Sequence, residues 1–275
     1  MKKDIAVVYM VAGVSSRFGG KIKQFAKVGV NGETLIESSL NQAIKAGFTK
    51  IIFVVGNKTE GPFKKMFGGN YRGIPVFYAS QKFDEGKRDR PWGTGDALVS
   101  AKSLVNCPFV VCNGDDLYGE RTFKILANHA MDNYEEGTAA TIGYRLINVL
   151  SEKGNVNRAI FKTNAGYVTD IEETYSINAE NMEEKGLKED SPCSQNIFAL
   201  HAAVIRELAI KNERFKEKNK DDRKAEFLLS NELSDLIKAG KLKMKIYPAV
   251  DKWIGITNPG DEEIVREFII KNNIL

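Results

Sequence analysis

The opening loop of the chain, residues 11–24, has the composition of an anion-binding segment. It follows the apolar run Ile5–Met10, and its three glycines let the main chain approach a ligand and present N–H groups. Like charges close together repel one another unless solvent or an anion screens them. We therefore expect the loop to bind phosphate, with a solvated surface loop as the alternative. From position 17 to position 27 the chain has no acid and four cations, which are Arg17, Lys21, Lys23 and Lys27.

Two adjacent carboxylates, Asp115 and Asp116, follow the apolar run Pro108–Cys112. Their mutual repulsion is costly unless a cation or a helix N-terminus compensates for it. A magnesium ion held by Asp115, with triphosphate oxygens in its other coordination positions, would meet that need. The alternative is that both residues only turn or cap the chain before a helix near Thr122. The cations of the opening loop favour the metal and phosphate interpretation.

A third polar cluster follows the run Ile74–Ala79 and begins at Gln81. The amide of Gln81 can both donate and accept hydrogen bonds, which recognition of a pyrimidine edge requires. Further on, two glycines flank Thr94 at the start of a helix, where bare backbone can bind an anion or lie against a flat base. A packed turn at 91–93 is the alternative. The nucleotide contacts expected in this cluster are Gln81, Gly93 and Thr94.

Strand-like and helical patterns alternate through the first half of the chain. This βαβα order predicts an α/β fold with a largely parallel sheet. Ligands bind such sheets beyond the carboxyl ends of the strands, so the three polar clusters should meet in space. The predicted strands are Ile5–Met10, Lys50–Val55, Ile74–Ala79, Pro108–Cys112 and Ala139–Arg145, and the predicted helices are Leu35–Ala46, Phe63–Phe67, Gly95–Leu104 and Thr122–Met131.

The second half is less regular, with a predicted hairpin around 164–166 and an exposed acidic excursion over 176–193. The stretch 211–224 is nearly all charged, which indicates a solvated helix face or a loop. No repeat or low-complexity linker divides the chain, so we expect a single domain over residues 1–275. The strands predicted here are Ala159–Lys162, Tyr167–Ile171, Ile197–Leu200 and Met244–Tyr247, and the helices are Ala203–Ile210, Ala225–Ala239 and Pro259–Lys271.

The composition excludes several classes of protein. An apolar share of 43% is ordinary for a soluble chain with a core, and a net charge of +4 is too small to predict nucleic-acid binding. Three cysteines without CxxC or Cys/His spacing argue against a disulfide framework and a zinc site. No apolar stretch approaches membrane-spanning length, and the start of the chain is too short for a signal peptide. We expect a cytoplasmic protein with no membrane or nucleic-acid partner.

Taken in order, the motifs resemble the sugar-1-phosphate nucleotidyltransferase superfamily, in which an Ala-Gly turn leads to an Arg and then a Lys. The chain is most similar to a bacterial and archaeal branch, and the similarity covers nearly its whole length. It implies the fold of nucleotide-diphospho-sugar transferases, a Rossmann-like three-layer α/β/α structure with a mixed, mostly parallel sheet. The nucleotide-binding half would be about 1–120 and the acceptor half about 121–275. The motifs are residues 11–24, Gly32–Thr34, Arg90–Thr94, Asn113–Gly119, Leu150–Arg158, Lys224–Phe227 and Asp251–Thr257.

The same resemblance implies a cofactor, partners and site residues. The cofactor is Mg²⁺, and the partners are a nucleoside triphosphate, with UTP or dTTP expected, and a sugar-1-phosphate. The oligomeric state stays open. By matching position, the nucleotide contacts are Ala12, Gly13, Gln81 and Gly93, the catalytic phosphate contacts are Arg17 and Lys23, the metal ligand is Asp115, and the acceptor contacts are Arg158, Glu172 and Asn196.

The chain departs from the family pattern at two positions. Many relatives have a second metal ligand, an Asp two residues after a Trp, but Gly255 stands two residues after Trp253 here. Asp251, before the Trp, is the alternative ligand. Well-known members also have a Lys after a Glu pair, where this chain has Thr174, so Arg158 is the alternative cation. Both departures concern the acceptor and the metal rather than the nucleotide.

The implied reaction is an in-line attack of a sugar-1-phosphate oxygen on the α-phosphorus of the triphosphate, with release of pyrophosphate. A phosphate nucleophile is already an anion, so positioning and charge neutralisation suffice. One alternative is a CTP-dependent transferase acting on phosphocholine or another phospho-alcohol, with an aromatic cage from Trp92, Tyr118 and Trp253. The other is a relative that senses nucleotides without turnover. The glycines do not form GxGxxG and no acid ends the second strand, which argues against a dehydrogenase.

Overall fold

The computed structural model describes residues 4–13, 21–151, 154–256 and 260–272. Arg17, one of the two predicted catalytic residues, and the glycine pair at 19–20 lie outside the described residues. Lys23, the other predicted catalytic residue, is described and begins the 3₁₀ helix Lys23–Phe25.

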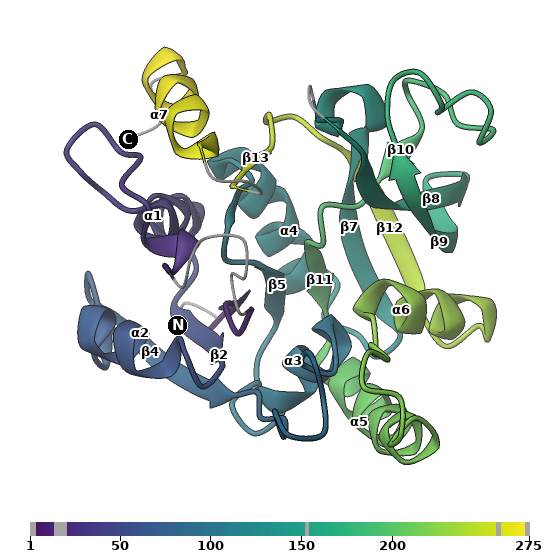
Figure 1. Ribbon diagram of the computed structural model, residues 1–275, viewed down its shortest axis with the longest axis horizontal. Coiled ribbons are helices and arrows are strands. Elements are labelled where there is room, and N and C mark those ends of the chain that lie inside the picture. The colour runs from purple at the N-terminus through teal and green to yellow at the C-terminus, as the bar shows by residue number, and fades with distance from the viewer. Residues whose placement is uncertain (1–3, 14–20, 152–153, 257–259, 273–275) are drawn as a thin grey trace.

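The first half of the chain forms a parallel part of the sheet, with the strand order β4-β2-β1-β5 (Figure 1). Val8 in β1 lies opposite Ile52 of β2 and Val111 of β5. Val7 and Tyr9 enter the core on one face of the sheet, and Val8 enters the core on the other. Burial on both faces explains why these strands are apolar without alternation. The strands are β1 Ala6–Met10, β2 Lys50–Val55, β4 Ile74–Ser80 and β5 Phe109–Asn113.

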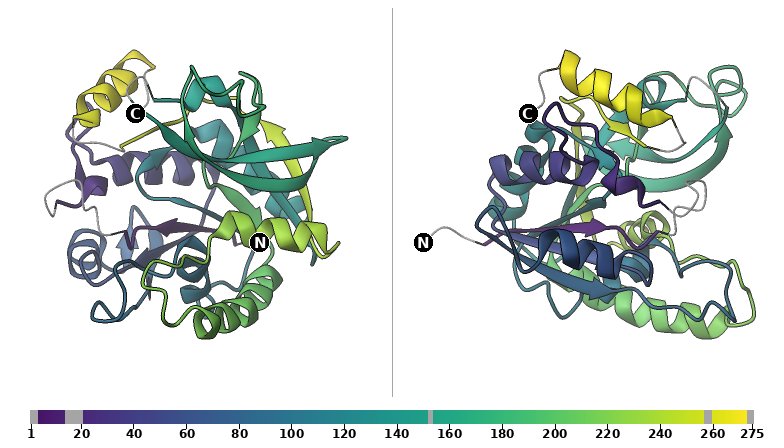
Figure 2. Two further views of the ribbon diagram at one scale, coloured as in Figure 1. Left: turned by 45° about the vertical axis from the view of Figure 1, so that its right-hand side comes forward. Right: turned by 60° about the vertical axis from the view of Figure 1, so that its left-hand side comes forward.

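The second half extends the sheet mainly with antiparallel pairs, so the expectation of a mostly parallel sheet is wrong for this half. β11 pairs antiparallel with both β5 and β7, and β12 returns parallel to β7. The β8–β9 hairpin projects from the sheet beyond β12 (Figure 2). Residue patterns reveal a strand but not its direction, which depends on the connection. The strands are β7 Thr138–Arg145, β8 Val156–Asn164, β9 Tyr167–Ile177, β10 Pro192–Cys193, β11 Phe198–Leu200 and β12 Lys243–Pro248, with β3 Asn70–Tyr71 at the opposite edge.

Helices cover both faces of the sheet, which gives three α/β/α layers (Figure 1). Residues of α1, α2 and α4 pack in the core cluster of one face, and residues of α3, α5 and α6 pack in that of the other. α7 packs outside these layers, with Val265 and Ile269 in a small cluster beside β6 and β13. The remaining bounds are α1 Leu35–Ala46, α2 Glu60–Phe67, α3 Thr94–Ser100, β6 Asp116–Leu117, α4 Glu120–Asp132, the 3₁₀ helix Leu146–Val149, α5 Ala202–Lys218, α6 Leu229–Lys238, β13 Ile254–Gly255 and α7 Asp261–Lys271.

Local signals account for the ends of α1. Thr34 caps the helix in a reciprocal arrangement with Glu37, in which each side chain bonds the other residue's backbone N–H. Gly47 ends the helix in the left-handed region, with φ of 104°, which a glycine adopts without steric cost. The predicted bounds of this helix are therefore confirmed.

Two helices in the second half differ from expectation. α5 continues to Lys218, so the charged stretch that begins at residue 211 is mostly helix rather than loop. α6 begins only at Leu229, because the preceding backbone bonds to the segment before α3, with Phe227 N donating to Trp92 O at 2.6 Å. None of the helices in the described ranges has the length and apolar character needed to cross a bilayer.

Candidate functional site

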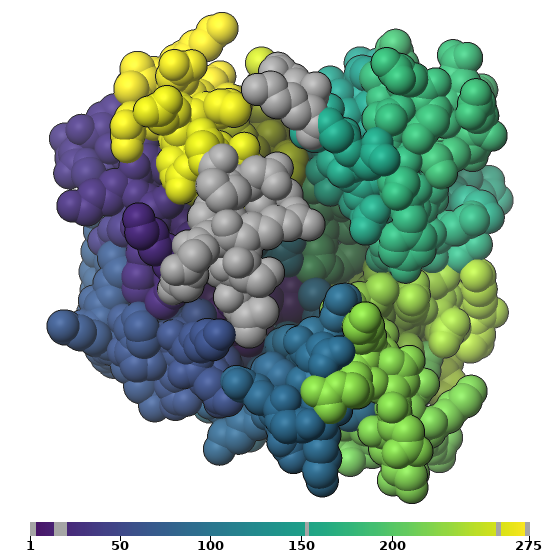
Figure 3. Space-filling model, viewed as in Figure 1, coloured from purple at the N-terminus to yellow at the C-terminus, as the bar shows by residue number. Residues whose placement is uncertain are grey.

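A cavity of about 570 Å³ lies at the carboxyl ends of β1, β4 and β5. In the space-filling view, this face is hollowed between the N-terminal segments, in purple and blue, and the later segments in green (Figure 3). The cavity is lined by Met10, Ala12, Gly13, Lys23, Gln24, Gln81, Asp89, Arg90, Pro91, Gly93, Thr94, Ala97, Asn113, Asp115 and Glu226.

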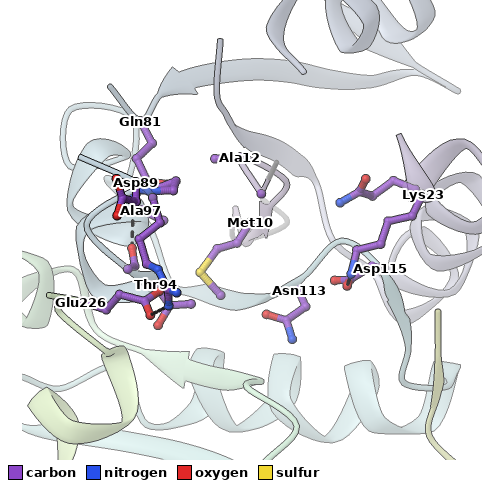
Figure 4. Close-up of a pocket in the computed structure, with 15 residues that line it drawn as sticks. Met10, Ala12, Lys23, Gln81, Asp89, Thr94, Ala97, Asn113, Asp115 and Glu226 are labelled. Atoms are coloured by element: carbon purple, nitrogen blue, oxygen red, sulfur yellow. Dashed lines mark hydrogen bonds and ion pairs between the residues drawn. The ribbon is translucent and has the colours of Figure 1, made fainter. Parts of the chain in front are cut away.

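The three polar clusters meet here, as the order of strands predicts. Gln81 and Thr94 lie on one side of the cavity, and Lys23 and Asp115 lie on the other, with Ala12 between them (Figure 4). The predicted residues that the structure brings together are Ala12, Gly13, Lys23, Gln81, Gly93, Thr94 and Asp115. Their proximity is confirmed, and the role of each stays a prediction.

Lys23 and Asp115 form an ion pair at one end of the cavity. The Lys23 ammonium also donates to the backbone oxygen of Ile256 at 3.3 Å, which joins the opening segment to the chain after β13. About a fifth of each paired side chain is exposed. The pair thus faces the cavity and is available to an anionic or cationic ligand.

Asp116, the neighbour of Asp115 in the chain, is buried. Its Oδ2 accepts a hydrogen bond from Asn113 Nδ2 at 2.9 Å, and the Tyr118 hydroxyl lies 3.1 Å from the same oxygen. Burial, and then the neighbouring charge of Asp115, raise the pKa of Asp116 to about 7. Asn196 donates to Asn113 Oδ1 at 2.7 Å, so this predicted acceptor contact lies directly behind the cavity wall.

The expected alternative metal ligand, Asp251, does not lie at this cavity. Its carboxylate accepts from Arg121 Nε at 2.7 Å and from the backbone N–H of Thr122 at 2.9 Å, so it binds the first turn of α4. It lines a separate cavity of about 550 Å³. The structure therefore does not support Asp251 as the alternative metal ligand, because a helix N-terminus and an arginine already hold its carboxylate.

A metal ion here would rely on Asp115. The described part of the chain contains no group of three His, Cys, Asp or Glu side chains that could hold one. Gly255 lies opposite Asp116 in the β6–β13 pair, and a Cβ at position 255 would collide with the Asp116 carboxylate. A side chain at 255 therefore cannot supply a second ligand without displacing Asp116. One partly exposed carboxylate, together with phosphate oxygens of a bound triphosphate, would fit Mg²⁺, which binds few protein groups and keeps several waters.

The hydrogen bonds of the Gln81 amide differ from those that the sequence led us to expect. Its Nε2 donates both hydrogens to the protein, to Gly93 O at 3.0 Å and to Asp96 Oδ2 at 2.9 Å. The amide therefore has only its oxygen left for a ligand. The expectation that Gln81 both donates to and accepts from a base is wrong.

The glycines beside Thr94 serve packing, as the packed-turn alternative predicts. Gly95 N donates to Phe227 O at 2.8 Å, and Thr94 Oγ1 accepts from Leu229 N at 3.0 Å. Gly93 has φ of 100°, and a Cβ there would lie 2.7 Å from Phe227 O. The bare backbone at Gly93 therefore lets two chain segments approach each other, while the residue still lines the cavity.

Gly93→Ala is expected to destabilise the protein by about 2–3 kcal/mol, because the backbone conformation is strained for any other residue and the new methyl group meets backbone. The urea midpoint of unfolding measures this loss. Gly61→Ala is the matched control, since a Cβ at Gly61 in α2 meets nothing within 4 Å. It should raise the midpoint, because alanine favours a helix. An unchanged midpoint for Gly93→Ala would contradict the packing argument.

Two predicted acceptor residues do not line the cavity. Arg158 lies over the ring of Trp253, 5.4 Å from its centroid, and donates to Val149 O at 2.7 Å in a separate cavity of about 420 Å³. Glu172 is exposed on β9 and pairs with Lys162 at 2.8 Å. The structure thus separates Arg158 and Glu172 from this cavity, and their role as acceptor contacts stays a prediction. Side chains of a hairpin alternate faces, and the residue pattern does not say which face meets the ligand.

Sequence reasoning assigned no role to Arg90 and Glu226, which also line the cavity. Arg90 Nη1 lies 2.7 Å from Glu226 Oε2, and both side chains are partly exposed. Each belongs to a motif that carries the family resemblance, and that membership is the signal that could have identified them. The pair joins the segment before α3 to the segment before α6.

Comparison with known proteins gives one family match. A family model described as nucleotidyl transferase matches residues 20–174. This range includes Lys23, Gln81 and Asp115 and ends before Asn196. Nothing among curated protein sequences matches the chain.

Many solved structures match the chain, and two of them are similar over nearly their whole length. One is from Bacillus anthracis, described as a candidate glucose-1-phosphate thymidylyltransferase in complex with sucrose; its TM-score is 0.71 at 15% identity, over 96% of this chain and 94% of that one. The other is the inositol-1-phosphate CTP transferase of T. maritima, with a TM-score of 0.66 at 14% identity, over 98% of this chain and 97% of that one. At these identities the likeness establishes the α/β architecture.

Proposed function

This chain belongs to the nucleotidyl transferase family, and on that premise we propose that it transfers a nucleoside monophosphate from UTP or dTTP to a sugar-1-phosphate. The products are a nucleoside diphosphate sugar and pyrophosphate. The observation that carries the proposal is one cavity with a cation and a carboxylate at one end and a buried amide, Gln81, at the other. That spacing suits a triphosphate at Lys23 and Asp115 and a base at Gln81.

Residues of the chain act by positioning and charge. The nucleophile is an oxygen of the sugar phosphate, which attacks the α-phosphorus in line as the bond to pyrophosphate breaks. Because this oxygen is already anionic, no side chain has to remove a proton. Lys23 neutralises phosphate charge, and Asp115 would hold Mg²⁺. The metal, when bound, supplies further charge neutralisation at the phosphates.

Lys23 pairs with Asp115. On binding of the metal and triphosphate, the ammonium would exchange this carboxylate for phosphate oxygens. Arg90 also lines the cavity, but it pairs with Glu226, which lies on the side of Gln81 and Thr94 and not on the side of Lys23 and Asp115 (Figure 4).

The alternative is a CTP-dependent transfer to phosphocholine or another phospho-alcohol, and the T. maritima neighbour is described as acting with CTP on an inositol phosphate. Three aromatic residues were candidates for a choline cage. Trp92 is covered by Arg88, 3.3 Å from its ring centroid, and Trp253 is covered by Arg158. Tyr118 is fully buried. These contacts argue against a choline acceptor. If the chain uses CTP, a polyol phosphate is therefore the better candidate acceptor than phosphocholine.

Pyrophosphate release tests both candidates. The protein is incubated with Mg²⁺, each of UTP, dTTP, CTP, ATP and GTP, and a panel of sugar-1-phosphates, inositol-1-phosphate and phosphocholine. Release with UTP or dTTP and a sugar-1-phosphate supports the proposal. Release with CTP and a phospho-alcohol alone supports the alternative. Nucleotide binding without release from any pair would contradict both and support a sensing role.

A further inference from the structure

Asp96 is a buried carboxylate on α3, at the base end of the cavity and behind its wall; only 2% of its surface is exposed. Three donors converge on it: Gln81 Nε2 at 2.9 Å, Asn212 Nδ2 at 2.8 Å and Lys216 Nζ at 2.6 Å. Buried carboxylates are costly unless such partners satisfy them. No step of the proposed reaction uses this carboxylate, and its contact with Gln81 gives it a function.

The contacts of Gln81 permit only one orientation of its amide. Nε2 lies between Asp96 Oδ2 and Gly93 O, which are both acceptors. A reversed amide would place its oxygen against a carboxylate oxygen and a carbonyl oxygen, and Asp96 Oδ2 would lose the donor that Gln81 supplies. The positions of these two acceptors therefore determine which end of the Gln81 amide carries the nitrogen.

α5 supplies the other two contacts and fixes the network from the far side. Lys216 compensates the charge of Asp96, and Asn212 Nδ2 donates to the same oxygen, Oδ1. Asn212 Oδ1 is buried without a hydrogen-bond partner among the described residues. A buried oxygen without a hydrogen-bond partner destabilises the fold, and here it accompanies the orientation in which Asn212 Nδ2 donates to Asp96. Oδ1 of Asp96 thus contacts the two α5 side chains, and Oδ2 accepts from Gln81.

We propose that Asp96 is a positioning residue that sets base selectivity, because it holds Gln81 as a hydrogen-bond acceptor facing the nucleotide. The proposal rests on the proposed function. Uracil and thymine have a single N–H on their pairing edge, at N3, so Gln81 Oε1 accepts from that atom. Cytosine has no proton on N3, so an acceptor placed opposite N3 is repelled, and the donor that cytosine has on this edge, the N4 amino group, lies one position away. Asp96 therefore favours UTP and dTTP over CTP without touching the base.

Wild-type protein provides the first test and needs no variant to fold. 3-Methyluridine triphosphate has the shape of UTP plus one methyl group and lacks the N3–H. Its kcat/KM should be lower than that of UTP by about tenfold to a hundredfold, as for other directed base contacts. Equal use of both nucleotides, or a wild-type preference for CTP over UTP, would overturn the inference.

Asp96→Asn provides the second test. Lys216 and Asn212 donate to Oδ1, so the new amide nitrogen faces Gln81 and turns its amide around. The UTP to CTP ratio of kcat/KM should fall by about tenfold to a hundredfold. The loss should appear in KM for UTP, with kcat nearly kept, because the phosphate end is unchanged. A merely structural role would lower kcat with both nucleotides and leave the ratio as it was.

Gln81→Glu in the Asp96→Asn background provides a rescue. The carboxylate introduced at position 81 can accept from the new amide and still face the base as an acceptor, so the UTP preference should return in part. The inference would be overturned if the UTP to CTP ratio of kcat/KM were unchanged in Asp96→Asn and if Gln81→Glu restored nothing. The proposed function would not be affected by that result. If wild-type protein releases no pyrophosphate with any pair of substrates, the proposed function fails and this inference fails with it.

Discussion

Asp115→Asn is expected to lower kcat/KM for pyrophosphate release by more than about 10²-fold. Changes to groups that only orient a metal ligand cost up to about 10²-fold, and Asp115 is the carboxylate that would bind the metal itself. The variant should keep its fold, since removing one of two neighbouring carboxylates relieves their repulsion. Steady-state rates at several Mg²⁺ concentrations, beside the binding of Mn²⁺ followed by electron paramagnetic resonance, measure both effects.

Asp84→Asn is the control for this variant. Asp84 lies in an exposed loop, where it pairs with Lys87 at 3.9 Å, and the substitution makes the same change in charge. Its rate should match wild type. If Asp115→Asn retained wild-type activity and Mn²⁺ affinity, the metal assignment would be wrong, and the two carboxylates would have only the turn-forming role considered above.

Lys23→Ala is expected to lower kcat/KM by about 10²–10³-fold, because a preorganised cation at the phosphates contributes to the transition state on that scale. Most of the loss should appear in kcat, since charge shifts among the phosphates as the bond breaks. The substitution also removes the ion-pair partner of Asp115. Single-turnover rates at saturating nucleotide separate the chemical step from binding.

Lys27→Ala is the matched control, since Lys27 is an exposed cation in the same segment and does not line the cavity. It should retain activity within about twofold, since exposed charges in water interact weakly with a ligand at a distance. Equal losses in the two variants would mean that the segment acts through its overall charge. That result would sink the assignment of Lys23 as a specific phosphate contact.

The sequence predicted the elements of the first half closely. The helix Leu35–Ala46 and the strand Lys50–Val55 have the predicted bounds, since a capping threonine, a terminal glycine and an apolar run are local signals. It also predicted that residues after β1, β4 and β5 meet, because parallel strands have their carboxyl ends at one edge of the sheet. Local pattern and strand direction were enough for these results.

The acceptor half could not be predicted to the same extent. Arg158 and Glu172 were grouped with the site, yet the one packs on Trp253 and the other faces solvent. Asp251 had the right chemistry for a metal ligand and lies instead at the N-terminus of α4. Side chains in these segments point according to antiparallel pairing and hairpin register, and a single sequence does not reveal either.

By itself, the sequence determined the kinds of elements, the family resemblance and the clustering of a cation, a carboxylate and an amide at strand ends. Only the tertiary structure decided which atoms of those groups face the cavity and which are bonded within the protein. Asp116 occupies the space beside Gly255, and Gln81 offers an acceptor because of Asp96, which Asn212 holds from 116 positions away along the chain. Periodicity reports which face of an element is buried. Hydrogen-bond direction depends on partners from distant segments, and these come together only in the folded chain.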